Sequence, residues 1–405
     1  MEKATLYPLK VINLKCDDAV LLIHHHDVAY VDSEGTLWLS AGIGKWVIAL
    51  SAVFRRVDLL LHVSPERKKK QDTAVREKNI RLVSLGPPGH YWDRIPRMQR
   101  IRKACNEAAT TADILLIRGL TPRQKTVWSN TPVSRKAFLL VRSPEQNRMT
   151  NWTFLNFFSA VVNLIREYEF RNIARTNTLI AANSPLYLQE LEKLSGRKVF
   201  FIPTNTIFRS EFPSLEIRKL NRTLRLLFVG RLHNLKGIRE FIGAIGMLRA
   251  QGIDCIADIA GEADAMTKTE LIMMANNLQI SDHLIWHNQV AFGPDLFNLY
   301  RQADFFILPT YSEGFPRVFW EAAGHSCPVI ITNVGGIPAI VEDRIHGILI
   351  PPKNTLAICE AVNQLKGDET LRHKIIEKAY ELAGSYTLEV CAEKLCNSFE
   401  EFWKE

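Results

Sequence analysis

Apolar residues along this chain occur as short runs separated by longer segments of helical periodicity. In the N-terminal half the runs predict strands at residues 19–23, 58–63, 80–84, 114–117, 137–141, 178–182 and 199–202. In the C-terminal half, runs at 226–229 and 305–309 predict two more strands, and the amphipathic segment 238–250 predicts a helix. Strands that alternate with helices form parallel sheets covered on both faces. The pattern therefore predicts an α/β protein with doubly wound parallel sheets.

The length of the chain predicts two domains. Single hydrophobic cores stop growing at roughly 250–300 residues, and the chain has 405. We place the first domain at residues 1–205 and the second at 206–387, with the hinge near 203–223. The hydrophobic content of 47% and the charged content of 23% are those of a globular protein.

Seven cysteines are scattered through the chain without a Cys-x-x-Cys pair. We therefore expect neither a disulfide framework nor a zinc site, and we interpret Cys391 and Cys396 as core positions of the last helix. This cysteine usage favours a reducing cytoplasm. The longest largely apolar stretch, residues 154–165, is shorter than the roughly 20 residues that span a bilayer, and no secretory signal is recognisable. Any membrane contact is therefore expected to be peripheral.

Positive charge is concentrated in one part of the chain. The net charge is +8, and residues 51–150 alone hold 21 Lys and Arg against 8 Asp and Glu. Such a surface can bind anionic lipid or a polyphosphate acceptor, and the alternative is a solvated surface that aids solubility. Nucleic acid is not an expected partner, because no nucleic-acid motif accompanies the charge.

Two glutamates mark a candidate ligand site in the second half. The strand predicted at 305–309 is followed by a turn that contains Glu313 and Gly314, and a helix is expected to open at Pro316 with Glu321 inside it. Free N–H groups at such a helix start suit a diphosphate, and a helix carboxylate can accept hydrogen bonds from a diol such as ribose. The alternative is that Glu313 is a charge at the helix N-terminus and Glu321 a solvated helix residue.

A second loop supplies positive charge. After the strand at 226–229, Gly230 and Arg231 are followed by Lys236 and Gly237, just before the helix at 238–250. Arg presents a planar fork to phosphate oxygens and Lys a point charge, so both can bind one polyanion. His233, inside this loop, is a lesser candidate for donor contact.

At these positions the chain resembles the retaining family 4 glycosyltransferases of the GT-B fold. The resemblance covers most of residues 178–405. Besides the two loops, it rests on Gly261, Glu262, Ala303, Asp304, Pro309, Pro328, Val329, Ile330, Gly335, Gly336, Pro338, Gly347 and Pro351, which stand in family order. It implies two Rossmann-like domains facing across a cleft, with the last helix, about 388–405, packing back on the first domain.

The resemblance also implies roles for the donor-site residues. Residues at the places of Arg231 and Lys236 hold the donor diphosphate, the glutamate at the place of Glu321 binds ribose, and the one at Glu313 faces the donor sugar. The expected catalytic residues are Glu313, Arg231 and Lys236. The expected donor-binding residues are Gly230, Arg231, Lys236, Glu313, Gly314, Phe315, Pro316, Arg317, Val318 and Glu321.

The acceptor side is predicted from the carboxyl ends of the N-terminal strands, where doubly wound folds bind ligands. Gly42 and Gly44 occupy the place of the family's glycine-rich acceptor loop, although a plain loop before a helix is an alternative. Arg118 and Arg142 stand where many family members have histidine, and each could bind an acceptor phosphate, assist the leaving diphosphate or be structural. The expected acceptor-binding residues are Gly42, Gly44, His26, Arg118 and Arg142.

The histidine run 24–26 is expected to follow the first strand directly. Adjacent residues on an extended segment point to opposite faces, so this run does not predict a compact metal site. His26 could bind an acceptor hydroxyl, and a loop or core histidine is the alternative.

Taken with the resemblance, these residues predict a retaining, metal-independent hexosyltransferase. No Asp-x-Asp signature ends a strand, and Arg231, Lys236 and a helix N-terminus can neutralise a departing nucleoside diphosphate. No cofactor is expected. The predicted partners are a nucleotide-sugar donor and a saccharide or lipid-linked acceptor of bacterial surface polysaccharide or glycolipid synthesis. Two alternatives stay open: a sugar-nucleotide epimerase of similar architecture, and a non-catalytic partner subunit that keeps only the donor site.

Overall fold

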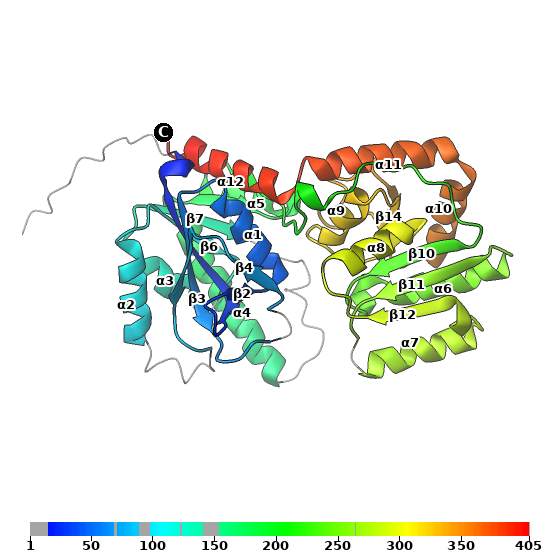
Figure 1. The fold of residues 1–405 in the computed structure, drawn as a ribbon, viewed down its shortest axis with the longest axis horizontal. Coiled ribbons are helices and arrows are strands. Elements are labelled where there is room, and N and C mark those ends of the chain that lie inside the picture. Colours follow the sequence, from blue (N-terminus) through cyan, green and yellow to red (C-terminus); the bar gives the residue numbers. More distant parts are fainter. Residues whose placement is uncertain are drawn as a thin grey trace, which may run out of the picture.

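Two α/β domains lie side by side in the computed structural model, which describes residues 15–68, 71–88, 98–121, 124–140, 154–263 and 265–404 (Figure 1). No helix in these ranges is both long enough and apolar enough to cross a membrane. Each domain is built on a largely or wholly parallel sheet, so the predicted fold class is confirmed.

The N-terminal sheet is centred on its first strand. β1 (Val20–Val31) pairs in parallel with β3 (Arg56–Val63) on one side and β6 (Ile114–Arg118) on the other. β5 (Ile80–Ser84) continues the sheet beyond β3, and β7 (Arg135–Leu140), β8 (Leu179–Ala182) and β9 (Phe200–Phe201) continue it beyond β6. The far end of β1 also pairs antiparallel with β2 (Leu37–Leu39), which pairs with β4 (Thr73–Val75).

Helices cover both faces of this sheet. They are α1 (Ala41–Ser51), α2 (Met98–Ala109), α3 (Gln124–Asn130), α4 (Phe154–Ala174) and α5 (Leu188–Ser195). One apolar core joins the sheet to α1, and another joins it to α2, α3 and α5. This two-sided burial explains why the strands read as apolar runs in the sequence.

The C-terminal sheet has six parallel strands in the order β12-β11-β10-β13-β14-β15. They are β10 (Leu224–Val229), β11 (Cys255–Ala260), β12 (Leu284–Asn288), β13 (Phe305–Leu308), β14 (Val329–Thr332) and β15 (Ile348–Ile350). The helices are α6 (Ile238–Ala250), α7 (Ala265–Asn277), α8 (Pro294–Gln302), α9 (Arg317–Gly324), α10 (Thr355–Gly367) and α11 (Glu369–Gly384). The predicted helix 238–250 is confirmed at both ends.

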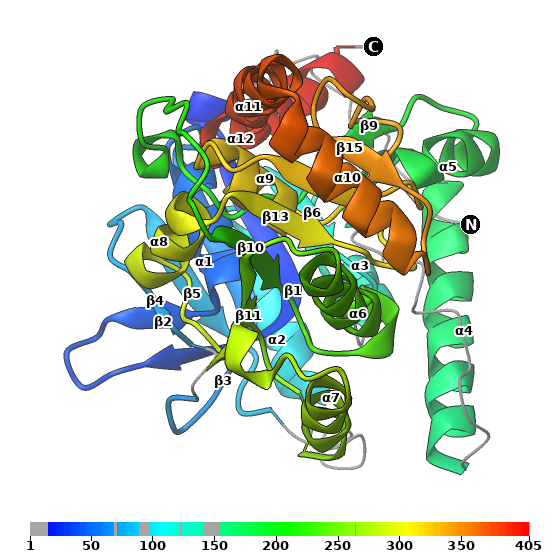
Figure 2. The same cartoon turned by 90° about the vertical axis from the view of Figure 1, so that its right-hand side faces the viewer.

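The last helix, α12 (Leu388–Phe402), returns to the N-terminal domain along the same side of the molecule as α11 (Figures 1 and 2). Its apolar residues Leu388, Leu395 and Phe399 belong to the core that α1 shares with the N-terminal sheet. Phe399 meets Phe54 with ring centroids 6.0 Å apart. The chain therefore crosses between the domains twice, through residues 202–223 and through α12.

Three expectations about the N-terminal domain are wrong. β1 continues through the histidine run to Val31, because it is the central strand and both His24 and His25 are buried. His24 Nδ1 lies 2.9 Å from the Leu60 carbonyl oxygen. α1 begins at Ala41, so Gly42 and Gly44 lie in its first turn and not in a loop. Cys16 and Cys396 form a disulfide that ties the start of the domain to α12.

Candidate functional site

Two loops of the C-terminal domain meet where neighbouring strands end. The loop after β10 contains a short 3-10 helix, Asn234–Lys236, and the loop after β13 contains residues 309–316. Because β10 and β13 pair in parallel, both loops leave the same edge of the sheet. The Tyr311 N–H donates to the Leu235 carbonyl at 2.8 Å, and the Thr310 hydroxyl donates to the same oxygen at 3.0 Å. The two loops are thus fixed to each other by backbone contacts.

Glycines allow this close approach. A Cβ atom at Gly237, where φ is +71°, would lie 1.9 Å from the Pro309 carbonyl oxygen. At Gly335, where φ is +60°, it would lie 1.8 Å from the Glu313 carbonyl oxygen. Both the backbone conformation and the space exclude a side chain at these positions. Glycine at positions 237 and 335 therefore allows these loops to pack closely against each other.

The meeting of the loops brings together two of the predicted catalytic residues. The Lys236 ammonium forms an ion pair and hydrogen bond with Oε1 of Glu313, and both side chains are mostly buried, with 15% and 12% of their surface exposed. An ion pair held away from bulk water is screened less than one on the surface. The pair places one positive and one negative group beside the start of α9.

The N-terminus of α9 is the third component of the site. Pro316 is the N-cap and the helix begins at Arg317, one residue later than expected. No side chain among the described residues caps this helix, so the N–H groups of Arg317 and Val318 remain available for an anion, whereas the Phe319 N–H donates to the Pro316 carbonyl at 3.2 Å. Gly314 accepts a hydrogen bond from the Ser184 hydroxyl of the N-terminal domain at 2.9 Å, and Phe315 stacks on Trp320 with centroids 4.6 Å apart. Val318 is half-buried and Arg317 is exposed.

The Glu321 side chain is buried. It is 5% exposed, and its two carboxylate oxygens accept hydrogen bonds from the Thr206 hydroxyl at 2.9 Å and the Tyr300 hydroxyl at 3.0 Å. Burial raises the pKa of this carboxyl group, and the nearby Arg317 partly offsets that rise. Thr206 belongs to the connection between the two sheets, so Glu321 also links the domains. Ribose binding by Glu321 stays a prediction.

The remaining residues of the β10 loop have distinct positions. Gly230 follows β10 directly, and Arg231 is exposed. His233 is the N-cap of the 3-10 helix, and its Nδ1 accepts a hydrogen bond from the Leu235 N–H at 3.2 Å. A capping role therefore accounts for His233 without a ligand.

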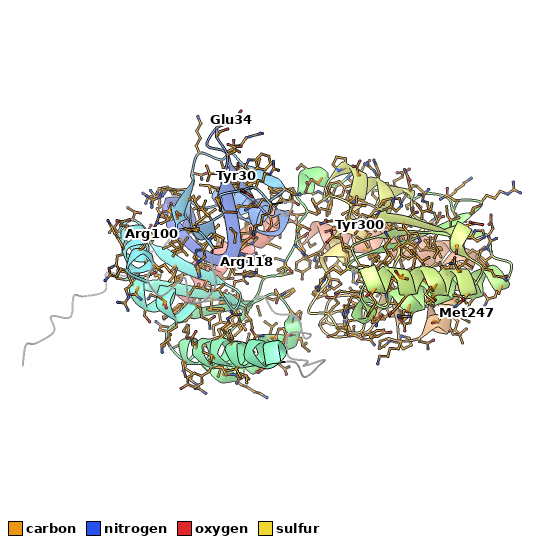
Figure 3. The ribbon with its side chains drawn as sticks, turned by 90° about the horizontal axis from the view of Figure 1, so that it is seen from below. Tyr30, Glu34, Arg100, Arg118, Met247 and Tyr300 are labelled. Atoms are coloured by element: carbon orange, nitrogen blue, oxygen red, sulfur yellow. A yellow bond between two sulfur atoms is a disulfide. The ribbon has the colours of Figure 1, made fainter. Side chains whose placement is uncertain are left out.

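Arg118 of the N-terminal domain (Figure 3) lies close enough to Arg317 of α9 for the two charges to interact. It is the last residue of β6, is 8% exposed, and its guanidinium carbon lies 5.0 Å from the centroid of the Trp46 ring. Its Nε has no hydrogen-bond partner among the described residues. Burial lowers the pKa of Arg118 to about 10, and the charge of Arg317 contributes to that decrease. At this pKa the side chain is still cationic at neutral pH.

The other predicted acceptor residues are only partly gathered near Arg118. A Cβ atom at Gly42 would lie 3.0 Å from Nη1 of Arg317, so the start of α1 approaches the C-terminal domain. At Gly44 a Cβ atom would lie 2.8 Å from Thr73, which gives that glycine a packing role. His26 is exposed, and its pKa is lowered chiefly by desolvation. Arg142 lies outside the described residues.

A hollow of about 270 Å³ adjoins the β10 loop and was not anticipated from the sequence. It lies at the carboxyl ends of β11 and β12, and its walls include Leu232, Glu262, Trp286 and Asn288. The Leu232 N–H donates to the Glu262 carbonyl at 2.8 Å, which fixes one wall. In the sequence, Gly261 and Glu262 only contribute to the family resemblance. That Trp286 lies beside them follows only from the fold.

One cluster of potential metal ligands occurs among the described residues. It consists of Cys16, Cys396 and Glu400, and it lies at α12 rather than at the strand ends. Its two sulfur atoms are joined in the disulfide. Metal independence of the strand-end site stays a prediction.

Comparison with known proteins places this geometry in context. Residues 215–382 match the family model described as glycosyl transferases group 1. The D-inositol 3-phosphate glycosyltransferase of Paenarthrobacter aurescens is 28% identical over 55% of this chain and 57% of its own length. The putative teichuronic acid biosynthesis glycosyltransferase TuaC of Bacillus subtilis is 28% identical over 52% of this chain and 53% of its own. The chain thus spans about half the length of the curated relatives it matches.

Solved structures extend the likeness to both domains. A glycosyltransferase from Rickettsia africae superposes with a TM-score of 0.68 at 15% identity, covering 95% of this chain and 99% of that one. Anabaena HepE in complex with UDP-glucose gives a TM-score of 0.68 at 15% identity, over 95% of this chain and 100% of that one. The two-domain arrangement is therefore the GT-B fold, as predicted.

Proposed function

We propose that this chain, whose residues 215–382 match the glycosyl transferases group 1, transfers a sugar from a nucleoside diphosphate sugar to an acceptor hydroxyl. The observation that carries this proposal is the convergence of Lys236, Glu313 and the uncapped start of α9 where β10 and β13 end. Cations and helix N–H groups suit a diphosphate, and a carboxylate beside them suits the hydroxyls of a sugar.

We assign the donor groups along this edge. Lys236, Arg231 and the first N–H groups of α9 bind the diphosphate, and Glu313 faces the sugar. The base enters the 270 Å³ hollow beside the β10 loop, where Trp286 offers an aromatic wall. The UDP and UDP-glucose complexes of HepE, which has the same fold, support a nucleotide-sugar donor. The identity of base and sugar is left to the experiment below.

The reaction is proposed to retain the anomeric configuration and to need no metal ion. As the bond from the anomeric carbon to the diphosphate oxygen breaks, Lys236 and the α9 N-terminus stabilise the developing negative charge. The acceptor oxygen then forms its bond to the same carbon on the same face, and a departing phosphate oxygen takes the hydroxyl proton. Glu313 is already engaged by Lys236, which favours this route over attack by an enzyme carboxylate.

Arg118 and Arg317 are proposed to act on an anion between the domains. Arg118 remains cationic and cannot serve as a general base. Arg317, whose charge lowers the pKa of Arg118, comes from the opposite domain, and like charges are held together more easily when an anion lies between them. We propose that this anion is a phosphate group of the acceptor. If it is instead the leaving diphosphate, Arg118→Gln will weaken nucleoside diphosphate binding as well as transfer.

Two observations bear on the acceptor and on the cellular location of this activity. TuaC carries teichuronic acid biosynthesis in its name, and a bacterial surface polysaccharide or glycolipid is the acceptor we propose. The basic residues between 51 and 150 are proposed to hold the protein peripherally at the inner face of the membrane from the cytoplasm.

The donor assignment is tested by thermal shift against UDP-, GDP-, ADP- and dTDP-sugars, each with and without EDTA. A ligand that binds only the folded state raises the unfolding midpoint. We expect a rise with one nucleotide class that EDTA leaves unchanged. Loss of the rise in Lys236→Ala but not in Arg249→Ala, a half-buried cation of the same domain, would tie it to this site. No rise with any nucleotide would reject the donor assignment.

Arg118 in the place of a histidine favours one second candidate, a partner subunit that binds donor without transferring sugar. Donor hydrolysis in the presence of the purified protein separates the two functions. Slow release of free sugar that Lys236→Ala abolishes supports the enzyme. Binding with no hydrolysis and no transfer to any phosphorylated or lipid-linked saccharide supports the subunit.

A further inference from the structure

The amino ends of the C-terminal strands border a second hollow, at the opposite end of the sheet from the donor site. It measures about 510 Å³ and lies among the starts of β10 and β13, the turn before β14, and α11. Six cationic side chains line it: Arg218, Lys219, Arg222, Arg225, Arg301 and Arg372. We call this the amino-edge pocket.

The pocket contains little negative charge, and that charge already accepts hydrogen bonds from the protein. The one carboxylate in its lining belongs to Asp304, which accepts the N–H groups of Asn221 at 3.0 Å and Arg225 at 2.7 Å. Asp304 therefore holds the incoming chain against β13. Arg225 is paired with Asp258, whose Oδ1 lies 2.8 Å from its Nη2. Asp304 and Arg225 are thus satisfied within the fold.

The other cations are not neutralised in this way. Arg218, Lys219 and Arg222, on the connection that leads into β10, have no ion-pair partner in the described part of the chain. Arg372 on α11 is only 4% exposed. Its Nη1 donates to the Leu365 carbonyl at 2.7 Å and its Nη2 lies 3.8 Å from Glu369, but its Nε has no hydrogen-bond partner among the described residues. A buried guanidinium with an unused donor is costly unless something accepts from it.

The lining also indicates which anion would fit. Cations enter from three directions, namely the connection before β10, the end of α8 and α11, so a single small ion cannot contact them all. The apolar part of the lining is aliphatic, from residues such as Leu220, Ile256 and Ile376, and no aromatic side chain is present to stack on a base. We propose that the amino-edge pocket binds a ligand carrying two or more phosphate groups and no nucleobase, at a site separate from the donor site.

Such a ligand would add to the contacts that already join these parts, among them the hydrogen bond that the Tyr380 hydroxyl of α11 donates to the Pro213 carbonyl at 2.9 Å. Phosphate oxygens bound by Arg218 and Arg222 on one side and by Arg301 and Arg372 on the other would fasten the interdomain connection to α8 and α11. The ligand can be a soluble polyphosphate or the phosphate-bearing headgroup of a lipid, since both present the same oxygens.

The test uses inorganic tripolyphosphate as the probe, titrated calorimetrically into wild type, Arg218→Gln/Arg222→Gln, Lys236→Ala and Arg249→Gln. Arg222 is exposed and Arg218 half-buried, so the double variant is expected to fold, and its unfolding midpoint is checked first. We expect at least about tenfold weaker binding in the double variant, since each lost charge-assisted hydrogen bond contributes appreciably. Arg249→Gln should bind as wild type does, and Lys236→Ala should keep the binding that the double variant loses.

Cosedimentation with phosphatidylcholine vesicles, with and without phosphatidylglycerol phosphate, identifies the source of the phosphates. Vesicle binding that the double variant loses assigns the pocket to a lipid headgroup, and tripolyphosphate binding alone assigns it to a soluble ligand. Absence of both would overturn the proposal. So would equal losses in Arg249→Gln and the double variant, because they would show only a general effect of charge. If Lys236→Ala loses tripolyphosphate and the double variant does not, the anion binds at the donor site instead.

Discussion

The carboxyl ends of the two sheets are constructed differently. In the C-terminal domain, loops from adjacent strands are fixed by backbone hydrogen bonds and glycine contacts, and their charged residues Lys236 and Glu313 pair with each other. In the N-terminal domain, the cations Arg118 and Lys45 reach the domain boundary from a strand and a helix. Lys45 pairs with Glu211 of the interdomain connection at 2.5 Å and lies 4.1 Å from the centroid of the Phe292 ring.

This difference bears on what each side can do. A rigid cation and carboxylate pair suits a donor that every turnover must present in one geometry. We expect Arg118, whose Nε has no hydrogen-bond partner among the described residues, to adapt more easily to different acceptors.

The largest effect is expected from Gly237→Ala. The added Cβ would lie 1.9 Å from the Pro309 carbonyl oxygen at a φ of +71°, so the two donor loops must separate. We expect a loss of more than about 3 kcal/mol in unfolding free energy, combining overpacking with backbone strain, and no nucleotide binding. The matched control is Gly196→Ala, where φ is +67° and no atom lies within 4 Å. Urea denaturation should give that variant a loss of only about 1 kcal/mol.

Lys236→Ala should reduce turnover by about 100-fold, the order of effect of losing one preorganised electrostatic contact to the transition state. It also leaves the Glu313 carboxylate, 12% exposed, without its ion-pair partner. Steady-state kinetics with saturating donor provide the measurement, and Arg249→Ala, which breaks a more exposed ion pair with Asp254 in the same domain, is the control. Equal turnover in wild type and Lys236→Ala would show that the paired loops are structural only.

His325 supplies a pH test of the packing behind Glu321. Its ring lies 4.5 Å from that of Phe297, and burial lowers its pKa to about 4. The unfolded chain, with a histidine pKa near 6.5, binds the proton more tightly, so stability falls as pH decreases from 6.5 toward 4. Between pH 6.5 and pH 5 we expect wild type to lose on the order of 2 kcal/mol more than His325→Gln. Parallel urea titrations that show the same loss in both proteins would contradict the burial of this ring.

A smaller effect is expected at the domain boundary. Lys45 and Glu211 have side-chain exposures of 10% and 26%, and burial lowers the pKa of Lys45. A double-mutant cycle with Lys45→Met and Glu211→Gln should give a coupling energy of about 1–2 kcal/mol, between the values of surface and buried pairs. The exposed pair Lys198 and Glu401 serves as the comparison and should couple by less than about 0.5 kcal/mol. Equal coupling in both cycles would remove the distinction between boundary and surface.

The C-terminal domain could be predicted from sequence in most respects because its determinants are local. The helix 238–250 and the strands at 226–229 and 305–309 follow from periodicity, and Gly237 and Gly335 stand where the backbone needs a left-handed conformation and space. The pairing of Lys236 with Glu313 follows once β10 and β13 are neighbours, which the sequence order by itself does not state.

The N-terminal side could not be predicted in the same way because its determinants are tertiary. The histidine run reads as the end of a strand, yet β1 continues because β3 and β6 bury it on both sides. Nothing in the sequence singles out Lys45, which becomes a buried partner of Glu211 only where the first domain meets the interdomain connection. Cys16 and Cys396 are 380 positions apart and meet only because α12 returns to the first domain.

We propose that a nucleoside diphosphate binds at the carboxyl ends of β10 and β13. A crystal structure of the protein with such a nucleotide and EDTA tests it most directly. We predict that the diphosphate contacts Lys236 and the first N–H groups of α9, with the base beside Trp286. A nucleotide found in the amino-edge pocket, or bound without contact to Lys236 and α9, would contradict this assignment of the donor site.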